Sequence, residues 1–477
     1  MKKLLSALLA VTTVFSSAAS ITAGAETSLL QGDVNLSGDV SISDATCIQK
    51  YCASLLELSS DQLSVADMNN DGKITVSDAT CIQKILAGVE EKPKEELTPE
   101  EIKAKGNAAM NDFSVALLKN SIADGENTLI SPISVIYALA MTANGANGET
   151  LSEMEDTLGM PIDQLNSYCK AYPTYLNNPY SQFEQVSIAN SIWYNSSENS
   201  SEISSDFLKT ANDFYSADVY PTAFDNNTLD RINGWVNEKT HKMIPKILNN
   251  INPEALLYLI NAVAFEADWQ NQYTERAVTK GTFTEENGDT SEVELMHSEE
   301  SIYLQDENAQ GFIKMYEGGN YAFAALLPDE GVKLSDYVQS LSGERLTKIL
   351  NEQKYMYHNV YARLPKFEVE YSDELSDNLT LMGMPDAFDS GKADFTNMIA
   401  NPLDESPYIS SVIHKTYISV TELGTRAGAA TAIDMPGSAA PSDEEPKRVY
   451  LDRPFVYMLI NTQTNTPLFI GTVENIK

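Results

Sequence analysis

Two acidic loops in register near the start of the chain, each followed by the same six residues, restrict the fold of that region more than any other pattern. The first runs from Asp33 to Asp44 and the second from Asp67 to Asp78, and each continues into Ala-Thr-Cys-Ile-Gln-Lys. Glycine stands at the sixth position of both loops, at Gly38 and Gly72, where a cation-binding loop must turn sharply. The repeat therefore predicts two small units of the same build.

Oxygen-bearing side chains occupy the ligand positions of both loops, while the seventh position needs only its backbone carbonyl. Both loops end in aspartate rather than the glutamate of an EF-hand. If an N-terminal signal is cleaved after Ala25, only Glu26 to Gly32 remain before the first loop, too few to form an incoming helix. Each copy is therefore predicted to be a loop followed by one helix. We expect two calcium ions, with these residues at the ligand positions: Asp33, Asn35, Ser37, Asp39, Ser41, Asp44, Asp67, Asn69, Asp71, Lys73, Thr75 and Asp78.

The first residues of the chain have the pattern of an export signal. Lys2 and Lys3 precede the apolar run from Leu4 to Val14, and an Ala-Gly-Ala sequence that ends at Ala25 supplies small residues for cleavage. No other run is long and apolar enough to cross a membrane. We expect a signal peptide over residues 1–25, a secreted, extracellular protein and no membrane insertion.

Charge and cysteine content exclude some classes of partner and fold. The formal net charge of −36, from 68 acidic and 32 basic residues, argues against nucleic acid as a partner. Cys47, Cys52 and Cys81 lie in the repeat and Cys169 lies far away, so no disulfide framework is visible. Cys47 and Cys81 occupy the same place in the two copies, and both a buried small side chain and a bridge remain open for them.

The rest of the chain favours an α+β fold. Residues 91–101 are charged and contain prolines, which is typical of a solvated linker. From Ile102 to Lys477, helical patterns come early and strand patterns late, without regular alternation. Ser131-Pro132 indicates a helix start with the serine as cap. Helical spacing covers 102–122, 149–159 and 229–247, and strand patterns cover 256–265, 321–327, 360–369, 455–460 and 468–473.

The segment from Thr425 to Met435 has the alternation of a strand but a low strand propensity. Its odd-numbered residues are all small or apolar, whereas its only charges, Arg426 and Asp434, are even-numbered. Because side chains alternate along a strand, an extended chain here would bury one face and leave both charges in water. Its glycines and alanines lower its strand propensity. Such a segment suits a loop that waits outside a sheet and joins it later.

Residues 30–90 resemble a type I dockerin, because the two loops are in register and share the helix start Asp-Ala-Thr-Cys-Ile-Gln-Lys. We assign residues 26–90 to a small all-α dockerin of two calcium loop–helix repeats. The resemblance implies a cohesin module of a scaffoldin as partner, and thereby association with a larger complex, such as a cellulosome, or with the cell surface. It implies two equivalent sets of contacting residues, either of which could dock: Ile42, Ser43, Gln49 and Lys50, and Val76, Ser77, Gln83 and Lys84.

A second resemblance covers residues 102–477. It is carried by motifs in a fixed order: Ser131-Pro-Ile-Ser134, Ala146-Asn-Gly-Glu-Thr150, Asn261-Ala-Val-Ala-Phe265 with Trp269, Asp386-Ala-Phe388 with Ala393-Asp-Phe395, His414-Lys415, Glu422 to Ala430, and Asp452-Arg-Pro-Phe455. On these motifs the region resembles a serpin, which implies a multi-helix domain with three β-sheets and an exposed reactive loop. In serpins a protease cleaves the loop and becomes acyl-bound, and the loop then inserts as a strand and distorts the protease. The chain would thus be a suicide-substrate protease inhibitor with no catalytic residues of its own.

The same resemblance assigns roles to individual residues. It implies a hinge at Glu422, Gly424, Thr425, Ala427, Ala429 and Ala430, and a shutter and breach at Ser131, Ser134, Asn261, His414 and Trp269. Counting along the loop places the reactive bond between Ser438 and Ala439, with Met435 and Ala440 as competing positions. Small residues there predict an elastase-like or subtilisin-like serine protease as target.

Two rival functions predict different features. A non-inhibitory serpin-fold binding protein on the same scaffold predicts a bulky or charged hinge, which Thr425 and the alanines disfavour. A hydrolase delivered by the dockerin would need a recognisable catalytic motif, and the chain has no Gly-x-Ser-x-Gly elbow. We expect a monomer when the protein is free.

Overall fold

The computed structural model describes residues 29–68, 73–87, 97–176, 184–196, 202–253, 255–401, 406–425 and 445–477. The chain divides into two compact units, Met1–Leu97 and Thr98–Lys477. In the described part of the chain, no helix is long and apolar enough to span a membrane.

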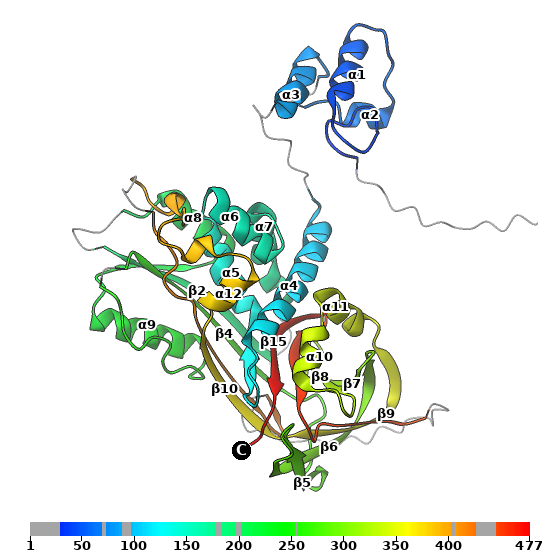
Figure 1. Cartoon of the computed structure of the whole chain (residues 1–477), viewed down its shortest axis with the longest axis vertical. Helices are drawn as coiled ribbons and strands as arrows, with labels where there is room; N and C mark the ends of the chain where they lie inside the picture. Colours follow the sequence, from blue (N-terminus) through cyan, green and yellow to red (C-terminus); the bar gives the residue numbers. More distant parts are fainter. Residues whose placement is uncertain are drawn as a thin grey trace, which may run out of the picture. The chain divides into compact units, whose positions relative to one another are not determined.

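The small unit is all-α, as the repeat predicts. Its helices are α1 (Ile42–Cys52), α2 (Ser60–Ser64) and α3 (Val76–Leu86), of which α1 and α3 follow the two acidic loops (Figure 1). Both of these helices begin with a capping box, in which an N-cap hydroxyl and the third-position aspartate satisfy free amides at the helix start. Equivalent residues of the two copies fill the core: Ala45 and Ile48 from the first, Ala79 and Ile82 from the second.

The large unit begins earlier than its hydrophobic periodicity indicates. Helix α4 spans Pro99–Ser121, so the predicted boundary at Ile102 and the linker end at residue 101 are a few residues too late. Thr98 caps the helix, its hydroxyl accepts from the Glu101 amide, and the Glu101 carboxylate accepts from the Thr98 amide. Pro99 adds a first-turn proline. These are polar signals, which a search for apolar spacing does not register.

The other helices of the large unit are α5 (Pro132–Ala143), α6 (Gly148–Leu158), α7 (Ile162–Leu176), α8 (Ser205–Tyr215), α9 (Asn226–Lys239), α10 (Leu334–Ser340), α11 (Gly343–Asn351) and α12 (Ser376–Met382), with 3₁₀ turns η1 (Glu275–Ala277), η2 (Asp386–Phe388) and η3 (Thr396–Met398). The pattern over 229–247 extends past the end of α9. His241 and Lys242 adopt left-handed backbone angles, with φ of 50° and 68°, which end the helix.

A six-stranded sheet forms the centre of the large unit, with strand order β10-β11-β12-β4-β2-β3. The strands are β2 (Glu184–Asn195), β3 (Asp218–Thr222), β4 (Leu257–Asp268), β10 (Phe367–Glu374), β11 (Ile413–Val420) and β12 (Gly424–Thr425). The long strand β4 contributes to two cores: Val263, Phe265 and Ala267 to the main core, and Ile260 and Ala262 to a second cluster under α9. Figure 1 shows α9 lying along this sheet.

A second sheet has nine strands, in the order β1-β15-β14-β8-β7-β6-β9-β13, with β5 also paired to β6. The strands are β1 (Thr128–Ile130), β5 (Val278–Thr284), β6 (Thr290–Gln305), β7 (Ala309–Met315), β8 (Tyr321–Pro328), β9 (Lys354–Pro365), β13 (Lys447–Tyr450), β14 (Phe455–Asn461) and β15 (Thr466–Val473). The register of β6 on β9 shifts between Glu300 and Ile302. Strand β6 pairs with β7 only from Ile302 onward, so it joins two sheet-like parts, which with the first sheet make the three that were expected.

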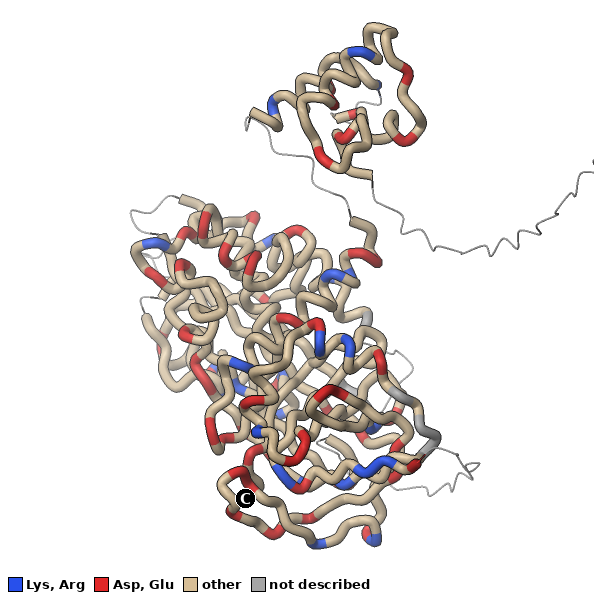
Figure 2. The backbone as a smooth tube through the Cα atoms, turned by 45° about the vertical axis from the view of Figure 1, so that its right-hand side comes forward, with Lys and Arg blue, Asp and Glu red and all other residues tan. Residues whose placement is uncertain are grey.

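Acidic side chains dominate the charged residues of both units, with scattered cations between them (Figure 2). One of those cations, Lys366 just before β10, forms an ion pair with Glu422, close to where the short strand β12 enters the central sheet.

Candidate functional site

The short strand β12 is the start of the predicted hinge, and it already lies in the central sheet. Thr425 is level with Val420 of β11 on one side and Ala267 of β4 on the other. A tight turn from Thr421 to Gly424 makes this possible, because the Thr421 amide donates to the Gly424 carbonyl at 3.0 Å. A side chain at Gly424 would lie 2.2 Å from the Ala267 carbonyl oxygen, so only glycine fits there.

Thr425 faces the core, as the alternation predicts. Its side chain is 2% exposed, and its hydroxyl forms a hydrogen bond with the hydroxyl of Tyr316, a fully buried residue after β7. Burial raises the pKa of the Tyr316 phenol well above its usual value, so both hydroxyls are neutral. Tyr316 stacks on Trp269 with ring centroids 4.4 Å apart. Of these residues, sequence reasoning identified Thr425 and Trp269 and missed Tyr316.

Trp269, the predicted breach residue, holds the backbone of the hinge turn. Its amide donates to the Leu423 carbonyl and its indole N–H to the Thr421 carbonyl, each at 2.8 Å. The adjacent Tyr273 amide donates to the Glu422 carbonyl at 3.0 Å. The residues after β4 therefore fix the turn from which β12 starts.

Glu422 is held by an ion pair that the sequence analysis did not identify. Lys366, which precedes β10, places its Nζ 2.8 Å from the Glu422 carboxylate and 3.1 Å from that of Glu294. The hydrogen bond from Lys366 holds the pKa of the Glu422 carboxyl below its usual range. A single lysine before a strand is too common a pattern to reveal this contact from sequence.

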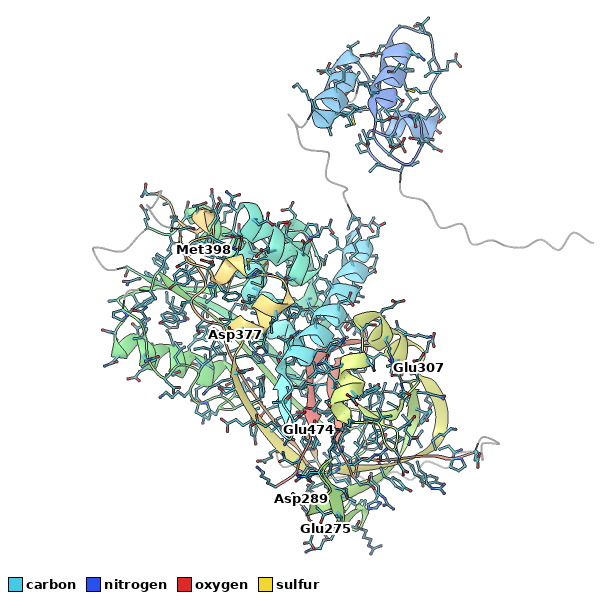
Figure 3. The ribbon with its side chains drawn as sticks, viewed as in Figure 1. Glu275, Asp289, Glu307, Asp377, Met398 and Glu474 are labelled. Atoms are coloured by element: carbon cyan, nitrogen blue, oxygen red, sulfur yellow. The ribbon has the colours of Figure 1, made fainter. Side chains whose placement is uncertain are left out.

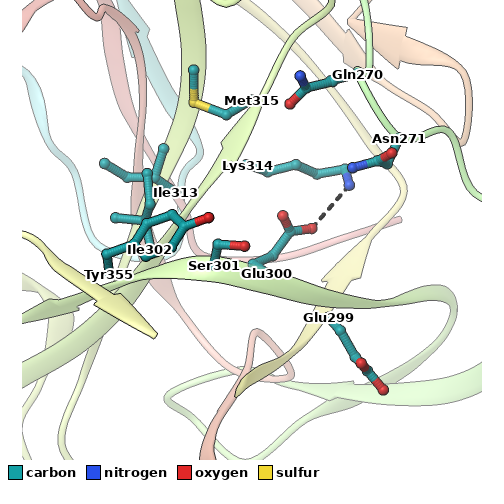
Figure 4. A pocket seen from close by; sticks show the side chains of 10 residues that line it. All are labelled: Gln270, Asn271, Glu299, Glu300, Ser301, Ile302, Ile313, Lys314, Met315 and Tyr355. Carbon is teal, nitrogen blue, oxygen red and sulfur yellow. Dashed lines mark hydrogen bonds and ion pairs between the residues drawn. The ribbon is translucent and has the colours of Figure 1, made fainter. Parts of the chain in front are cut away.

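A cavity of about 330 Å³ lies between β6, β7, Tyr355 of β9 and the segment that follows Trp269, at Gln270 and Asn271 (Figure 4). Its walls include a buried ion pair, in which the Lys314 ammonium lies 2.9 Å from the Glu300 carboxylate. The same ammonium lies 4.4 Å from the Tyr273 ring centroid and 5.4 Å from that of Trp269. Cation–π contact with desolvated aromatic rings stabilises the buried ammonium and helps to hold the Trp269 ring in place.

The predicted shutter residues form two hydrogen-bonded pairs. The Ser134 hydroxyl donates to the Asn261 side-chain oxygen, and the Asn261 amide donates to Asn190 of β2 at 2.7 Å. The Ser131 amide donates to Nε2 of His414 at 3.1 Å. Burial lowers the pKa of His414 to about 4, so the ring is neutral and accepts this bond. Sequence reasoning missed Asn190, one of several polar residues in β2.

Ser131 stands at the N-cap of α5, but its side chain does not cap the helix. Its hydroxyl makes no cap hydrogen bond and is buried without a partner among the described residues. The prediction of a capping serine is therefore correct for the position and wrong for the side chain. The backbone amide of Ser131 donates to Nε2 of His414.

Several predicted residues lie outside the described part of the chain. They are the signal peptide, Ala427, Ala429 and Ala430 of the hinge, Ser438 and Ala439 with the competing Met435 and Ala440 of the reactive bond, and Asn69 and Asp71 of the second acidic loop.

The first acidic loop is built as a framework that fits a cation. Asp33 accepts from the Ser37 and Gly38 amides, at 2.9 Å and 2.7 Å, and Asp44 accepts from the Asn35 and Ser41 amides. The side-chain oxygen of Asn35 is buried without a partner among the described residues, as a ligand oxygen would be. Among all the residues that the structure describes, no group of three or more His, Cys, Asp or Glu side chains could hold a metal. The oxygen ligands of this loop are thus of the type that calcium binds, but they do not form a closed metal site.

The eight predicted cohesin contacts are all on the surface. Ile42 and Val76 are 59% and 57% exposed, which is unusual for apolar side chains at helix starts, and their six polar companions are exposed as well. None of the four cysteines, all of which lie in the described ranges, forms a disulfide; Cys47 and Cys81 are half-buried and Cys169 is buried. No bridge therefore links the two copies.

Comparison with known families supports both assignments. A family described as Serpin (serine protease inhibitor) matches residues 108–476, and the type I dockerin domain matches residues 31–87. An uncharacterized serpin-like protein of Thermococcus kodakarensis is 32% identical over 77% of this chain and 85% of its own length. Leukocyte elastase inhibitor A of Mus musculus is 27% identical over 73% of this chain and 92% of its own length.

Solved structures agree with the fold. The thermophilic serpin tengpin in its native state is 44% identical, with a TM-score of 0.72, and the match covers 80% of this chain and 96% of tengpin. Human thyroxine-binding globulin complexed with its ligand, at 22% identity and a TM-score of 0.68 over 79% of this chain and 100% of its own, shares the fold alone.

Proposed function

The chain belongs to the serpin family and carries an N-terminal type I dockerin domain, and from this premise we propose that it irreversibly traps serine proteases by reactive-loop cleavage and insertion. The observation that carries the proposal is the placement of Thr425. A hinge residue that is already paired on both sides and buried on the core face is the beginning of a strand that can be extended.

The neighbouring strands supply a path for that extension. Within the described residues, β4 and β11 are bridged only by the two residues of β12. Continued in the same antiparallel register, the chain would bring Thr431 level with both His414 and Asn261. The two shutter pairs thus lie on the line along which the sheet would have to open. At about 0.5–1.5 kcal/mol net for each new hydrogen bond, a full strand would supply on the order of 10 kcal/mol towards deforming a protease.

The target proposed is an elastase-like or subtilisin-like serine protease, cut between Ser438 and Ala439. The small residues there support this choice, and one relative is named as an inhibitor of leukocyte elastase. The rival, a non-inhibitory binding protein on the same scaffold, is disfavoured by the small, core-facing Thr425.

The experiment is to mix the full-length protein with subtilisin, pancreatic elastase and trypsin and to look for a denaturant-resistant complex by gel electrophoresis. Mass spectrometry of the released C-terminal peptide locates the cut. We expect complexes with subtilisin or elastase. Cleavage without any complex would refute the trapping function, and faster inhibition of trypsin would refute the proposed specificity.

The dockerin is proposed to bind two calcium ions and a cohesin module of a scaffoldin, so that the secreted inhibitor acts as a monomer attached to an extracellular complex. The two exposed residue sets are nearly equivalent, which supports docking in two orientations. The test is binding of a cohesin to Gln49→Ala/Lys50→Ala, to Gln83→Ala/Lys84→Ala and to the combined variant. Dual docking predicts that only the combined variant loses binding, and loss with either pair alone would show a single mode.

A further inference from the structure

The hydroxyls of Tyr316 and Thr425 form a side-chain hydrogen bond that ties β12 to the core beneath it. Thr425 is 2% exposed and Tyr316 fully buried, so neither hydroxyl has water as an alternative partner. A buried hydroxyl without a partner carries its full desolvation penalty. A strand that brings a hydroxyl to Tyr316 is therefore more stable than one that leaves the Tyr316 hydroxyl without a partner.

The tyrosine is held in place by neighbours other than Thr425. It stacks on Trp269 at an interplanar angle of 9° and meets the edge of Phe265 at 5.1 Å between ring centroids. Trp269 is itself fixed by its two hydrogen bonds to the hinge turn and by the buried Lys314 ammonium, which Glu300 neutralises (Figure 4). The Tyr316 hydroxyl is thus a fixed point rather than a mobile side chain.

The sequence around Thr425 makes that fixed point selective for register. A shift of one residue would bring Gly424 or Arg426 to Tyr316, and a shift of two would bring Leu423 or Ala427. None of these side chains has a hydroxyl. A one-residue shift would also turn the even-numbered charges of the loop into the core, because neighbouring residues point to opposite faces.

From these contacts we propose that Tyr316 is the register-setting residue of strand insertion, a positioning residue that pairs with the Thr425 hydroxyl and keeps every later loop residue on its correct face. The inference rests on the proposed trapping function and names the residue that aligns the inserting strand. Correct register matters for trapping because insertion competes with release of the cleaved inhibitor, and a misaligned strand has to reverse before it can continue.

The test compares full-length wild type with Tyr316→Phe, Thr425→Val and the double variant, each titrated against subtilisin. The readout is the number of inhibitor molecules consumed for each protease molecule trapped. Each single change leaves one buried hydroxyl unpaired, and we expect that number to rise about fivefold, as for loss of one net hydrogen bond. The double variant, with neither hydroxyl, should return towards wild type, because removing both partners is nearly neutral.

Tyr321→Phe is the matched control. Tyr321 is also buried, also meets Phe265 edge-on and also uses its hydroxyl, but it donates to the Leu176 carbonyl, away from the hinge. Its loss should lower thermal stability without changing the consumption of inhibitor. A merely structural role for Tyr316 would give the same result as this control and would overturn the inference, as would additive effects of the two single changes.

Failure of the inference and failure of the proposed function are distinguishable. If wild type forms no covalent complex and gains no thermal stability when its loop is cut, insertion itself does not occur and the trapping function is wrong. If wild type traps subtilisin and the Tyr316 and Thr425 variants do so equally well, only the inference is wrong. Should Tyr316→Phe not fold, Thr425→Val alone decides, since it keeps a β-branched side chain of the same shape.

Discussion

The Nζ of Lys366 lies 2.8 Å from the carboxylate of Glu422, so the residue that precedes β10 fixes the residue at which the hinge begins. Both side chains are partly exposed, 26% and 39%, and an ion pair of this kind contributes only about 0–1 kcal/mol to global stability. Its importance is local, because Glu422 lies in the turn from which β12 starts.

Replacement of Glu422 by lysine should loosen the hinge with little effect on the rest of the fold. The new cation would face Lys366 and leave Glu294 as the carboxylate neighbour of that lysine. We expect a loss of about 1 kcal/mol in the free energy of unfolding, together with a larger rise in amide hydrogen exchange at residues 421–425. Lys392→Ala breaks the 2.9 Å ion pair with Asp386, which lies outside the hinge, and serves as control. Equal exchange at residues 421–425 in both variants would contradict the local role.

Acid should destabilise the large unit through His414. Its pKa is about 4 when buried, against 6.5 for the free side chain, so the unfolded state binds a proton that the folded state does not. The contribution of neutral His414 to the free energy of unfolding is therefore fully present above pH 6.5. It falls as the pH drops towards 4, by at most about 3 kcal/mol. Glu474, at the end of β15 (Figure 3), has a pKa raised to about 7 by burial and nearby carboxyls, and it opposes this trend.

The contribution of His414 is isolated by difference. Urea unfolding of wild type and His414→Gln at pH 7 and pH 4.5 gives the pH dependence of each, and glutamine keeps an acceptor for the Ser131 amide. We expect wild type to lose more stability than the variant between these values. A variant with the same pH dependence as wild type would show that His414 does not titrate in this range.

Local patterns in the sequence predicted the α+β class and the core-facing side of Thr425, and motif resemblance predicted the serpin fold, whereas the hinge and cohesin-contact roles stay predictions. Thr425 was found from two-residue alternation, and the acidic loops were found from their spacing. Tyr316, Lys366 and Asn190 were missed because their roles depend on partners 109, 56 and 71 residues away.

Removal of calcium should unfold the dockerin and leave the inhibitor domain intact. The carboxylates of Asp33 and Asp44 are held by backbone amides, and without a cation the buried Asn35 oxygen has no partner among the described residues. Metal binding would then supply much of the free energy that folds this small unit. Chelation should abolish a separate low-temperature calorimetric transition and cohesin binding, while subtilisin trapping persists.

Thr425→Arg should convert the inhibitor into a substrate. The side chain at this position points into the core, so a buried, unpaired guanidinium would cost several kcal/mol in the inserted strand. Arg426→Ala is the control, since alternation places residue 426 on the opposite face. The measurement is the ratio of covalent complex to cleaved inhibitor after reaction with subtilisin. We expect the Thr425→Arg variant to be cleaved with almost no complex and the control to match wild type. Undiminished complex formation by Thr425→Arg would mean that the inserted strand does not begin at β12.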